Sequence, residues 1–343
     1  KRASYYALAM RTSPPPPQYQ AHAEAHAEAR TSRPHDDRFA AIVVPCSARK
    51  CAAPAAKLNG RQLSPGTINR VAREWNRALA LPDVPRFRAD RLYQGGAFSR
   101  AKATAEALAC PLFVLSAGLG LVHSATEVPA YELSLSPDAP SSLLERVSGQ
   151  FDPFAWWSTL AKGPYSTIPG AVTTGTGRVL VALTRPYAGL FSAAFSELPA
   201  ADIARFRIFG PGIKPHLPEN MRPQVMEHRR EVDAVLPGMC LDAGARGLSH
   251  FASLSGLSTS GDVKADQDVY DQSLIDYRSP ARVRRSRLSD PVLRHHVSQM
   301  VTAGLSVTAA LKHLRVGLGV ACEANRFRRI YVEVSRCLPI MQC

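Results

Sequence analysis

Four short apolar runs, separated by longer stretches with helical periodicity, limit most strongly what this chain can fold into. The runs are FAAIVV, which begins at Phe39, followed by PLFVLSAGLGLV, RVLVALT and ARFRIFG. Runs with so little polar alternation are typical of strands buried on both faces of a parallel sheet. Because helical segments alternate with these strands, the sequence predicts an α/β fold with a mostly parallel sheet flanked by helices.

The segments between the apolar runs predict the helices. Ser64 has the position of an N-cap, and Pro65 follows in the first turn. We expect helices over residues 64–80, 97–109, 140–161 and 187–198. Ligands of such sheets bind beyond the carboxyl ends of the strands, so the loops at those ends are the first places to look for a site.

Composition divides the chain of 343 residues into four parts. Residues 1–38 contain TSPPPPQYQ and AHAEAHAEAR, which are low-complexity sequences, and we expect a disordered extension there. Residues 39–256 would form the α/β domain. Residues 257–288 turn polar and then basic, as a linker does, and residues 289–343 would form a separate helical unit.

The predicted helical unit has the layout of a helix-turn-helix. Its first helix would be capped by Asp290, carry Pro291 in its first turn and end at Gly304. Ser306 would cap the second helix, and a turn with two glycines leads to the third. A small helical bundle with a solvated basic face has the same pattern, so this layout leaves both interpretations open.

The charge of the chain favours a polyanionic partner. The formal net charge is +14, and residues 277–343 alone carry twelve Lys and Arg against three Asp and Glu. Binding to phosphates is favoured by such a surplus because it releases counterions. We therefore expect DNA, in double-stranded form, as the partner, although a basic protein without a nucleic-acid role has a similar composition. The residues expected to contact it are Arg282, Arg284, Arg285, Arg287, Asn325, Arg326 and Arg329.

Several classes of protein are disfavoured. No run is long enough for a membrane span, and the N-terminal residues lack the layout of a signal peptide, so we expect a cytoplasmic protein without a membrane partner. The seven cysteines show no CxxC spacing, which argues against a zinc ribbon or a disulfide framework. We expect no metal and no cofactor, and the oligomeric state is left open.

The loop PCSARK after the first strand is the first candidate site. Ser47 and Lys50 could hold a phosphate or a leaving group. Cys46 could be a nucleophile, because nearby cations lower the pKa of a thiol. His123 would then be its base, but a buried, inert thiol that shapes the loop is the alternative.

Two further loops contain candidate residues. In LYQGGAFSRA, two glycines precede a helix and Tyr93 would stack on a base or pack inside. In LSAGLGLVHSATEVPAYELSL, a glycine-containing turn follows a strand, and acidic and aromatic residues come close behind. The candidates from this loop and from the RPYAGLF segment after the third strand are Ser116, Gly118, Glu127, Tyr131, Glu132, Arg185 and Tyr187.

Four blocks in this order carry a resemblance to a known family: VPCSARK, RLYQGGAFSRA, FVLSAGLGLV and VPAYELSL. Together they resemble a bacterial and phage-borne family that combines Cys-Ser and a basic residue with Leu-Tyr-x-Gly, Leu-Ser-Ala-x-x-Gly-Leu and Pro-x-Tyr followed by an acid. The Pro-Cys-Ser loop is also similar to that of archaeosine synthase, whose domain is akin to the uracil-DNA glycosylase superfamily. The resemblance covers about residues 40–250, and the tail LKHLRVGLGVACEANRFRRIY is similar to the helical tail of such proteins.

The resemblance implies a uracil-DNA-glycosylase-like fold and a hydrolase that acts on N-glycosyl bonds. The characterised relative that the resemblance suggests is an anti-phage DNA glycosylase that removes glucosylated bases, which implies base excision in anti-phage defence. Two departures affect the site: Glu132 stands where aspartate is usual, and the lysine-rich stretch after Cys-Ser is shortened to Ala48-Arg49-Lys50.

The resulting hypothesis assigns roles to the candidates. Glu132 or Glu127 would activate water or stabilise the sugar cation, with Ser47 as a third catalytic residue. The residues expected to bind substrate are Cys46, Lys50, Tyr93, Ser116, Gly118, Tyr131, Arg185 and Tyr187. Two alternatives stay open: an enzyme that modifies or exchanges bases in tRNA, and a non-catalytic regulator that senses a nucleotide and binds DNA.

Overall fold

The computed structural model describes residues 37–337 except 82–83, 138, 258–260 and 280–284. The N-terminal extension expected over residues 1–38 therefore lies almost wholly outside the described part. The chain divides into two compact units, residues 1–279 and 280–343.

A five-stranded sheet forms the centre of the first unit. Its order is β4-β3-β1-β6-β7, in which β3, β1, β6 and β7 are parallel and β4 is antiparallel to β3. The four apolar runs supply the parallel strands, which confirms a mostly parallel sheet. The strands are β1 (Phe39–Pro45), β3 (Leu112–Ser116), β4 (Gly120–His123), β6 (Arg178–Ala182) and β7 (Phe206–Phe209).

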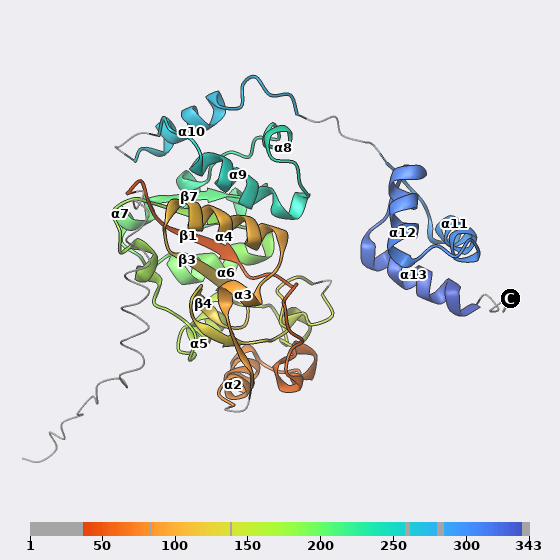
Figure 1. Ribbon diagram of the computed structural model, residues 1–343. Helices are drawn as coiled ribbons and strands as arrows, with labels where there is room; N and C mark the ends of the chain where they lie inside the picture. The colour runs from red at the N-terminus through yellow and green to blue at the C-terminus, as the bar shows by residue number, and fades with distance from the viewer. Residues whose placement is uncertain (1–36, 82–83, 138, 258–260, 280–284, 338–343) are drawn as a thin grey trace, which may run out of the picture. The chain divides into compact units, whose positions relative to one another are not determined.

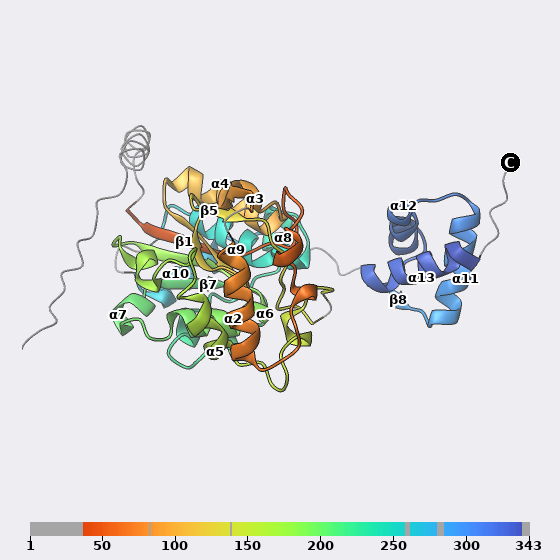
Figure 2. The ribbon, with the colours of Figure 1, turned by 90° about the horizontal axis from the view of Figure 1, so that it is seen from below.

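Helices cover both faces of this sheet. Helices α4 and α9 pack together, α4 against β1 and α9 against β6 and β7 (Figure 1). On the other face α6 contacts α5, which lies beside α2 in both views (Figure 1, Figure 2). The helices of this unit are α2 (Ile68–Leu79), α3 (Ala89–Leu92), α4 (Gly96–Leu108), α5 (Pro153–Leu160), α6 (Arg185–Phe195), α7 (Ala200–Ile203), α8 (Val232–Val235), α9 (Ala243–Ala252) and α10 (Val263–Gln272).

Two phenylalanines of β7 show how each face is filled. Phe206 packs against Phe191 and Phe195 of α6, whereas Phe209 packs against Phe251 of α9. Residues an odd number apart in a strand point to opposite faces, so α6 and α9 lie on opposite sides of the sheet. Their apolar faces complete a core that is continuous through the unit.

The direction of the connections reverses between β1 and β6. From β1 the chain crosses to β3 on one side, and from β6 it crosses to β7 on the other. This is a topological switch point, where the loops at the carboxyl ends of neighbouring strands diverge and leave room for a ligand. A small second sheet, made of the antiparallel strands β2 (Arg86–Arg88) and β5 (Glu127–Pro129), lies elsewhere in the same unit.

We had expected the polar stretch after Gly256 to be a linker over its whole length. Only part of it is. It contains α10, which is anchored to the sheet by Asp266. The Asp266 carboxylate accepts bonds from Arg178 Nε and Nη2 at 2.6 and 2.8 Å and from Arg207 Nε at 2.7 Å. All three side chains are buried. The first unit therefore extends to about residue 279, because this ion cluster draws a polar helix into the fold.

The second unit contains three helices around its own apolar core. They are α11 (Asp290–Thr302), α12 (Val307–Lys312) and α13 (Ala324–Cys337), and a π-helical turn over His313–Gly317 extends α12. Short parallel strands β8 (Ser286–Arg287) and β9 (Val320–Ala321) pair beside them. The core consists of Leu293, Val297, Met300, Ala310, Leu314, Val320, Cys322, Phe327 and Ile330.

Some of the predicted helix ends are confirmed, and others lie at different residues. Ser306 caps α12, since its Oγ accepts a bond from the Ala309 amide at 3.3 Å. Asp290, expected as a cap, is instead the first residue of α11. The helix expected over residues 140–161 is shorter, because α5 begins at Pro153, where Asp152 caps it through the Phe154 amide. Among the described residues, no helix is long and apolar enough to cross a bilayer.

Candidate active site at the strand ends

The carboxyl ends of β1, β3 and β6 bring most of the candidate residues together. The Cys46 amide continues the pairing of β1 with β3 by donating to the Leu115 carbonyl at 2.9 Å. From the other side of the switch point, Tyr187 in the first turn of α6 places its hydroxyl 3.0 Å from Cys46 Sγ. These two residues are 141 positions apart in the chain.

The loop after β1 is held in one conformation by its own polar groups. Ser47 Oγ donates to the Arg49 carbonyl at 2.7 Å and accepts from the Gly95 amide at 3.1 Å. The Gln94 amide also donates to the Arg49 carbonyl, at 3.0 Å. A Cβ on Gly95 would lie 2.6 Å from that of Ser47, so only glycine permits this approach. The Ser47 hydroxyl, expected to be catalytic, thus holds the loop in place.

Behind this loop lies a buried chain of hydroxyl groups. Ser116 Oγ accepts bonds from the amides of Gly118 at 3.2 Å and Leu119 at 3.0 Å. Both lone pairs are then in use, so its proton goes to the Tyr131 hydroxyl, 2.5 Å away. The Tyr131 hydroxyl shares a second hydrogen bond with the Tyr93 hydroxyl, at 3.1 Å. The chain fixes the orientation of both tyrosine rings.

Burial keeps these phenols protonated. It raises the pKa of Tyr93, Tyr131 and Tyr187 above the ordinary value, and the neighbouring Cys46 thiol adds to the effect. Proton donors are therefore present around Cys46 at neutral pH. Tyr93 and Tyr131 are only 2% and 1% exposed, so of the two alternatives for Tyr93 the structure favours packing inside, and neither ring is open to a substrate. They form the wall of the site, and Tyr187 alone of the three is half-buried.

We had expected the turn after β3 to bind substrate. In the structure it supports the site instead. Its carbonyls at Ala117 and Gly118 accept bonds from the indole nitrogens of Trp156 at 2.8 Å and Trp75 at 2.6 Å. A Cβ on Gly118 would lie 2.9 Å from atoms of Trp75 and Tyr131. Since Ser116 takes up the amides of this turn, none of these groups is available to a phosphate or base.

Lys50 brings a cation into the cluster. Its ammonium donates to the Ser47 carbonyl at 3.1 Å and lies 4.5 Å from the centre of the Tyr131 ring. Burial lowers the pKa of Lys50, and the nearby Cys46 and Glu132 oppose that shift. A half-buried ammonium with a lowered pKa binds an anion and also releases a proton readily.

Of the two candidate glutamates, only Glu132 belongs to this cluster. It follows Tyr131, is half-buried, and its charge acts on Lys50. Its Oε2 accepts a bond from Asn59 Nδ2 at 3.3 Å, and the two residues are also bridged through their backbones. Glu127 is exposed and lies opposite Arg88 in the β2–β5 pair. Its expected catalytic role therefore has no support in the geometry.

Two other candidates are not joined to the cluster. Arg185 is exposed at the start of α6, with its guanidinium beside Gly212. His123 pairs with Phe113 at the amino end of β3 and packs its ring on that residue. Cys46 follows the opposite end of the neighbouring strand, roughly 10 Å further along at 3.3 Å per residue. A Cys46–His123 nucleophile pair is therefore wrong.

Sequence reasoning missed several residues that position the site. Asn59 restrains Glu132, Gly95 admits the Ser47 side chain, and Trp75 and Trp156 hold the turn after β3. The glycine pair before α4 was a signal from which the role of Gly95 could have been predicted. Nothing local in the sequence links Asn59 to a carboxylate 73 residues away.

The second unit presents a basic stripe on α13. It consists of the exposed residues Asn325, Arg328, Arg329, Val332 and Arg336, opposite the buried Phe327 and Ile330. Arg328 and Arg336 have no carboxylate within ion-pair distance among the described residues. Arg329 lies 3.8 Å from Asp290 yet stays 64% exposed.

The other residues expected to contact nucleic acid lie outside the basic stripe. Arg326 is half-buried and donates to Asp290 and to the Leu288 carbonyl, so it fastens α13 to α11 and is not part of the basic stripe. Arg285 donates to the Arg315 carbonyl at 2.9 Å, and Arg287 is exposed. The remaining two, Arg282 and Arg284, lie outside the described residues.

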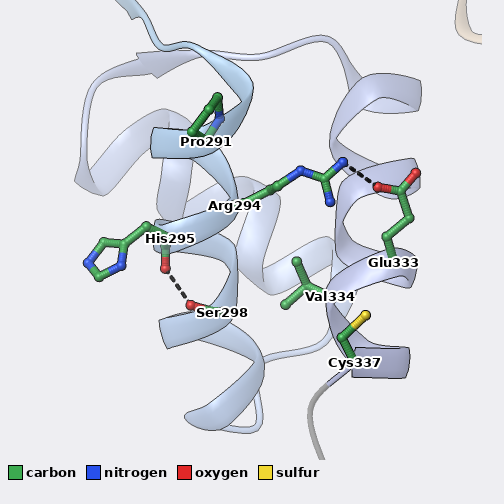
Figure 3. Close-up of a pocket in the computed structure, with 7 residues that line it drawn as sticks. All are labelled: Pro291, Arg294, His295, Ser298, Glu333, Val334 and Cys337. Atoms are coloured by element: carbon green, nitrogen blue, oxygen red, sulfur yellow. Dashed lines mark hydrogen bonds and ion pairs between the residues drawn. The ribbon is translucent and has the colours of Figure 1, made fainter.

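A shallow hollow of about 440 Å³ lies between α11 and α13 (Figure 3). Arg294 crosses it to form an ion pair with Glu333 at 2.6 Å, and Cys337 lies at its end. Two more hollows lie near Val269 and Lys57 in the first unit. In the described part of the chain, His, Cys, Asp and Glu side chains form no group of three that would hold a metal ion.

Comparison with known proteins adds one similarity. Residues 84–149 match the model of a family of unknown function, DUF6884. The matched segment contains Tyr93, Tyr131 and Glu132 but not Cys46 or Lys50. No curated protein and no solved structure matches the chain. The match carries no activity, so function has to be argued from the site.

Proposed function

We propose that the first unit hydrolyses the N-glycosidic bond of a modified nucleobase in DNA and leaves an abasic site. The observation that carries the proposal is the joint presence of a half-buried Glu132 and a half-buried Lys50 at the switch point of the sheet. Breaking this bond creates a positive sugar and a negative base at the same time. A carboxylate and an ammonium in the same site would complement both charges.

The two residues take opposite roles in this reaction. Glu132 stabilises the oxocarbenium-like sugar or orients the water that attacks C1′, and Asn59 keeps its carboxylate in place. Lys50 binds the departing base and gives it a proton, which its lowered pKa favours. Both electrons of the C1′–N bond leave with the base, and water supplies the hydroxyl at C1′.

The remaining groups would bind the base and keep water ordered. The Cys46 thiol and the Tyr187 hydroxyl are half-buried beside the loop and have hydrogen-bonding capacity toward exocyclic groups. The wall of Tyr93 and Tyr131 gives these groups a rigid support. A base must leave the duplex before it enters the site, at a cost of about a few kcal/mol.

The second unit would offset that cost by binding the DNA backbone. In a helix-turn-helix arrangement α13 is the helix that enters the major groove, and its basic stripe faces outward. The cations of the stripe would contact phosphates and release counterions. The uracil-DNA-glycosylase-like fold and the role in anti-phage defence that the sequence resemblance implies are part of this proposal.

Mass spectrometry of free bases tests the proposal. The full chain is incubated with unmodified DNA and with phage DNA that carries glucosylated bases, and released bases are identified. We expect release from modified DNA, loss of release in Glu132→Gln, and normal release in Glu127→Gln, whose residue is exposed and outside the cluster. Absence of any released base from both DNAs would refute the proposal.

A further inference from the structure

We propose that the Lys50 amine also forms an imine with C1′ of the abasic sugar, so that the protein cleaves the DNA strand 3′ to that sugar. The inference rests on the proposed function in one respect only: the same site must accept a DNA sugar. It assigns a second activity, abasic-site lyase, to residues already gathered at the switch point.

The position of Lys50 supports a nucleophilic role. Its amine has a single hydrogen bond to protein among the described residues, to the Ser47 carbonyl, and the loop that carries it is fixed by Ser47 and Gly95. The Tyr131 ring below it blocks one side. Lys50 is half-buried, as are Cys46 in the same loop and Glu132, so its side chain is still in part accessible to a ligand.

The chemical state of the amine fits as well. An amine attacks a carbonyl only when it is neutral, and burial lowers the pKa of Lys50 toward neutrality. In the proposed first step the ammonium gives its proton to the departing base. That transfer leaves Lys50 neutral at the moment when the abasic sugar is formed next to it.

The steps balance without a further reactant. The amine lone pair forms the C1′–N bond with the open-chain aldehyde. The aldehyde oxygen takes up one proton from the amine and one from solvent and leaves as water, which gives a protonated imine. A base then removes a C2′ proton, and the C–H electron pair forms the C2′–C3′ double bond as the 3′-phosphate leaves with its own bonding pair. Water finally hydrolyses the imine, which releases the unsaturated aldehyde and restores the lysine.

Glu132 is the group that would remove the C2′ proton. It follows Tyr131, whose ring centre lies 4.5 Å from the Lys50 ammonium, so the carboxylate belongs to the same cluster as the amine that would hold C1′. Asn59 donates to Oε2 of Glu132, and among the described residues no side chain donates to its other oxygen, which would accept the proton. One carboxylate thus serves both the bond cleavage and the elimination.

Borohydride trapping tests this inference on a duplex with a preformed abasic site, so that base release is not required. Reduction of the imine gives a covalent protein–DNA adduct, and peptide mass spectrometry identifies the residue attached. We expect an adduct at Lys50, its loss in Lys50→Arg, which keeps the positive charge, and its retention in Lys57→Arg, an exposed lysine of the neighbouring 3-10 helix. Thermal unfolding of the three proteins verifies that each is folded.

The outcomes separate the two proposals. Adduct formation without base release from modified DNA would overturn the proposed function and leave the lyase in place. Base release without any adduct, or an adduct that survives Lys50→Arg, would overturn the inference alone.

Discussion

Replacing Asp266 by asparagine is the sharpest available perturbation of the first unit. The carboxylate is buried between two buried guanidiniums, with three bonds of 2.6–2.8 Å to Arg178 and Arg207. Asparagine has nearly the same shape but no charge, so the two buried arginines would lose the counterion that they share. Breaking a buried ion pair by removing one partner costs about 3–5 kcal/mol.

This cost would appear in equilibrium urea unfolding and in thermal melting. For a domain of this size, each kcal/mol lowers Tm by about 2–4 °C, which gives a decrease of roughly 6–20 °C. Hydrogen exchange would show the first loss of protection in α10, because Asp266 holds that helix against β6 and β7.

A neighbouring pair on the same helix supplies the control. Lys264 and Asp268 form an exposed ion pair at 2.8 Å, and exposed pairs contribute little to stability. Asp268→Asn should therefore leave the unfolding curve of the protein unchanged. Equal effects of the two substitutions, or an Asp266→Asn protein as stable as the wild type, would refute the argument that this buried cluster anchors α10.

Two further predictions concern the site and the pH dependence of stability. Gly95→Ala would displace the Ser47 loop, because the new Cβ would lie 2.6 Å from that of Ser47, and a displacement of about 1 Å should lower the rate of base release by about 10²-fold. Gly170→Ala, with open space around its Cβ, should leave the rate unchanged, and equal rates in both variants would contradict this account of the loop. Burial lowers the pKa of His250, so the unfolded chain binds a proton there more readily and stability is lost as pH falls below the ordinary pKa of about 6.5. His250→Gln should reduce the loss of Tm between about pH 7 and pH 5 without abolishing it, because burial lowers the pKa of His228 too, and an unchanged slope would show that His250 does not contribute.

Local patterns in the sequence were sufficient for the strands and for several loops. The apolar runs became β1, β3, β6 and β7, because residues buried on both faces cannot alternate with polar ones. Once those strands are parallel, their carboxyl ends share one edge of the sheet. For that reason the loops after β1, β3 and β6 could be predicted to lie at one edge of the sheet without knowledge of a single contact.

What local patterns could not decide was which partner each polar side chain would find. Glu127 and Glu132 look alike in the sequence, yet one lies exposed opposite Arg88 and the other meets Asn59 and Lys50. Arg326 looks like its neighbours on α13, yet Asp290 takes it out of the basic stripe.

The physical reason is that polar interactions act over a few ångströms between residues that the chain separates widely. Arg178 and Asp266 are 88 positions apart, and Cys46 and Tyr187 are 141 apart. Hydrophobic periodicity is a property of neighbours in sequence, so the sequence by itself determined the strands and the edge at which their loops meet. The identity of the ion pairs, and with it the choice between a buried support and an available functional group, was decided only when the tertiary structure brought those distant segments together.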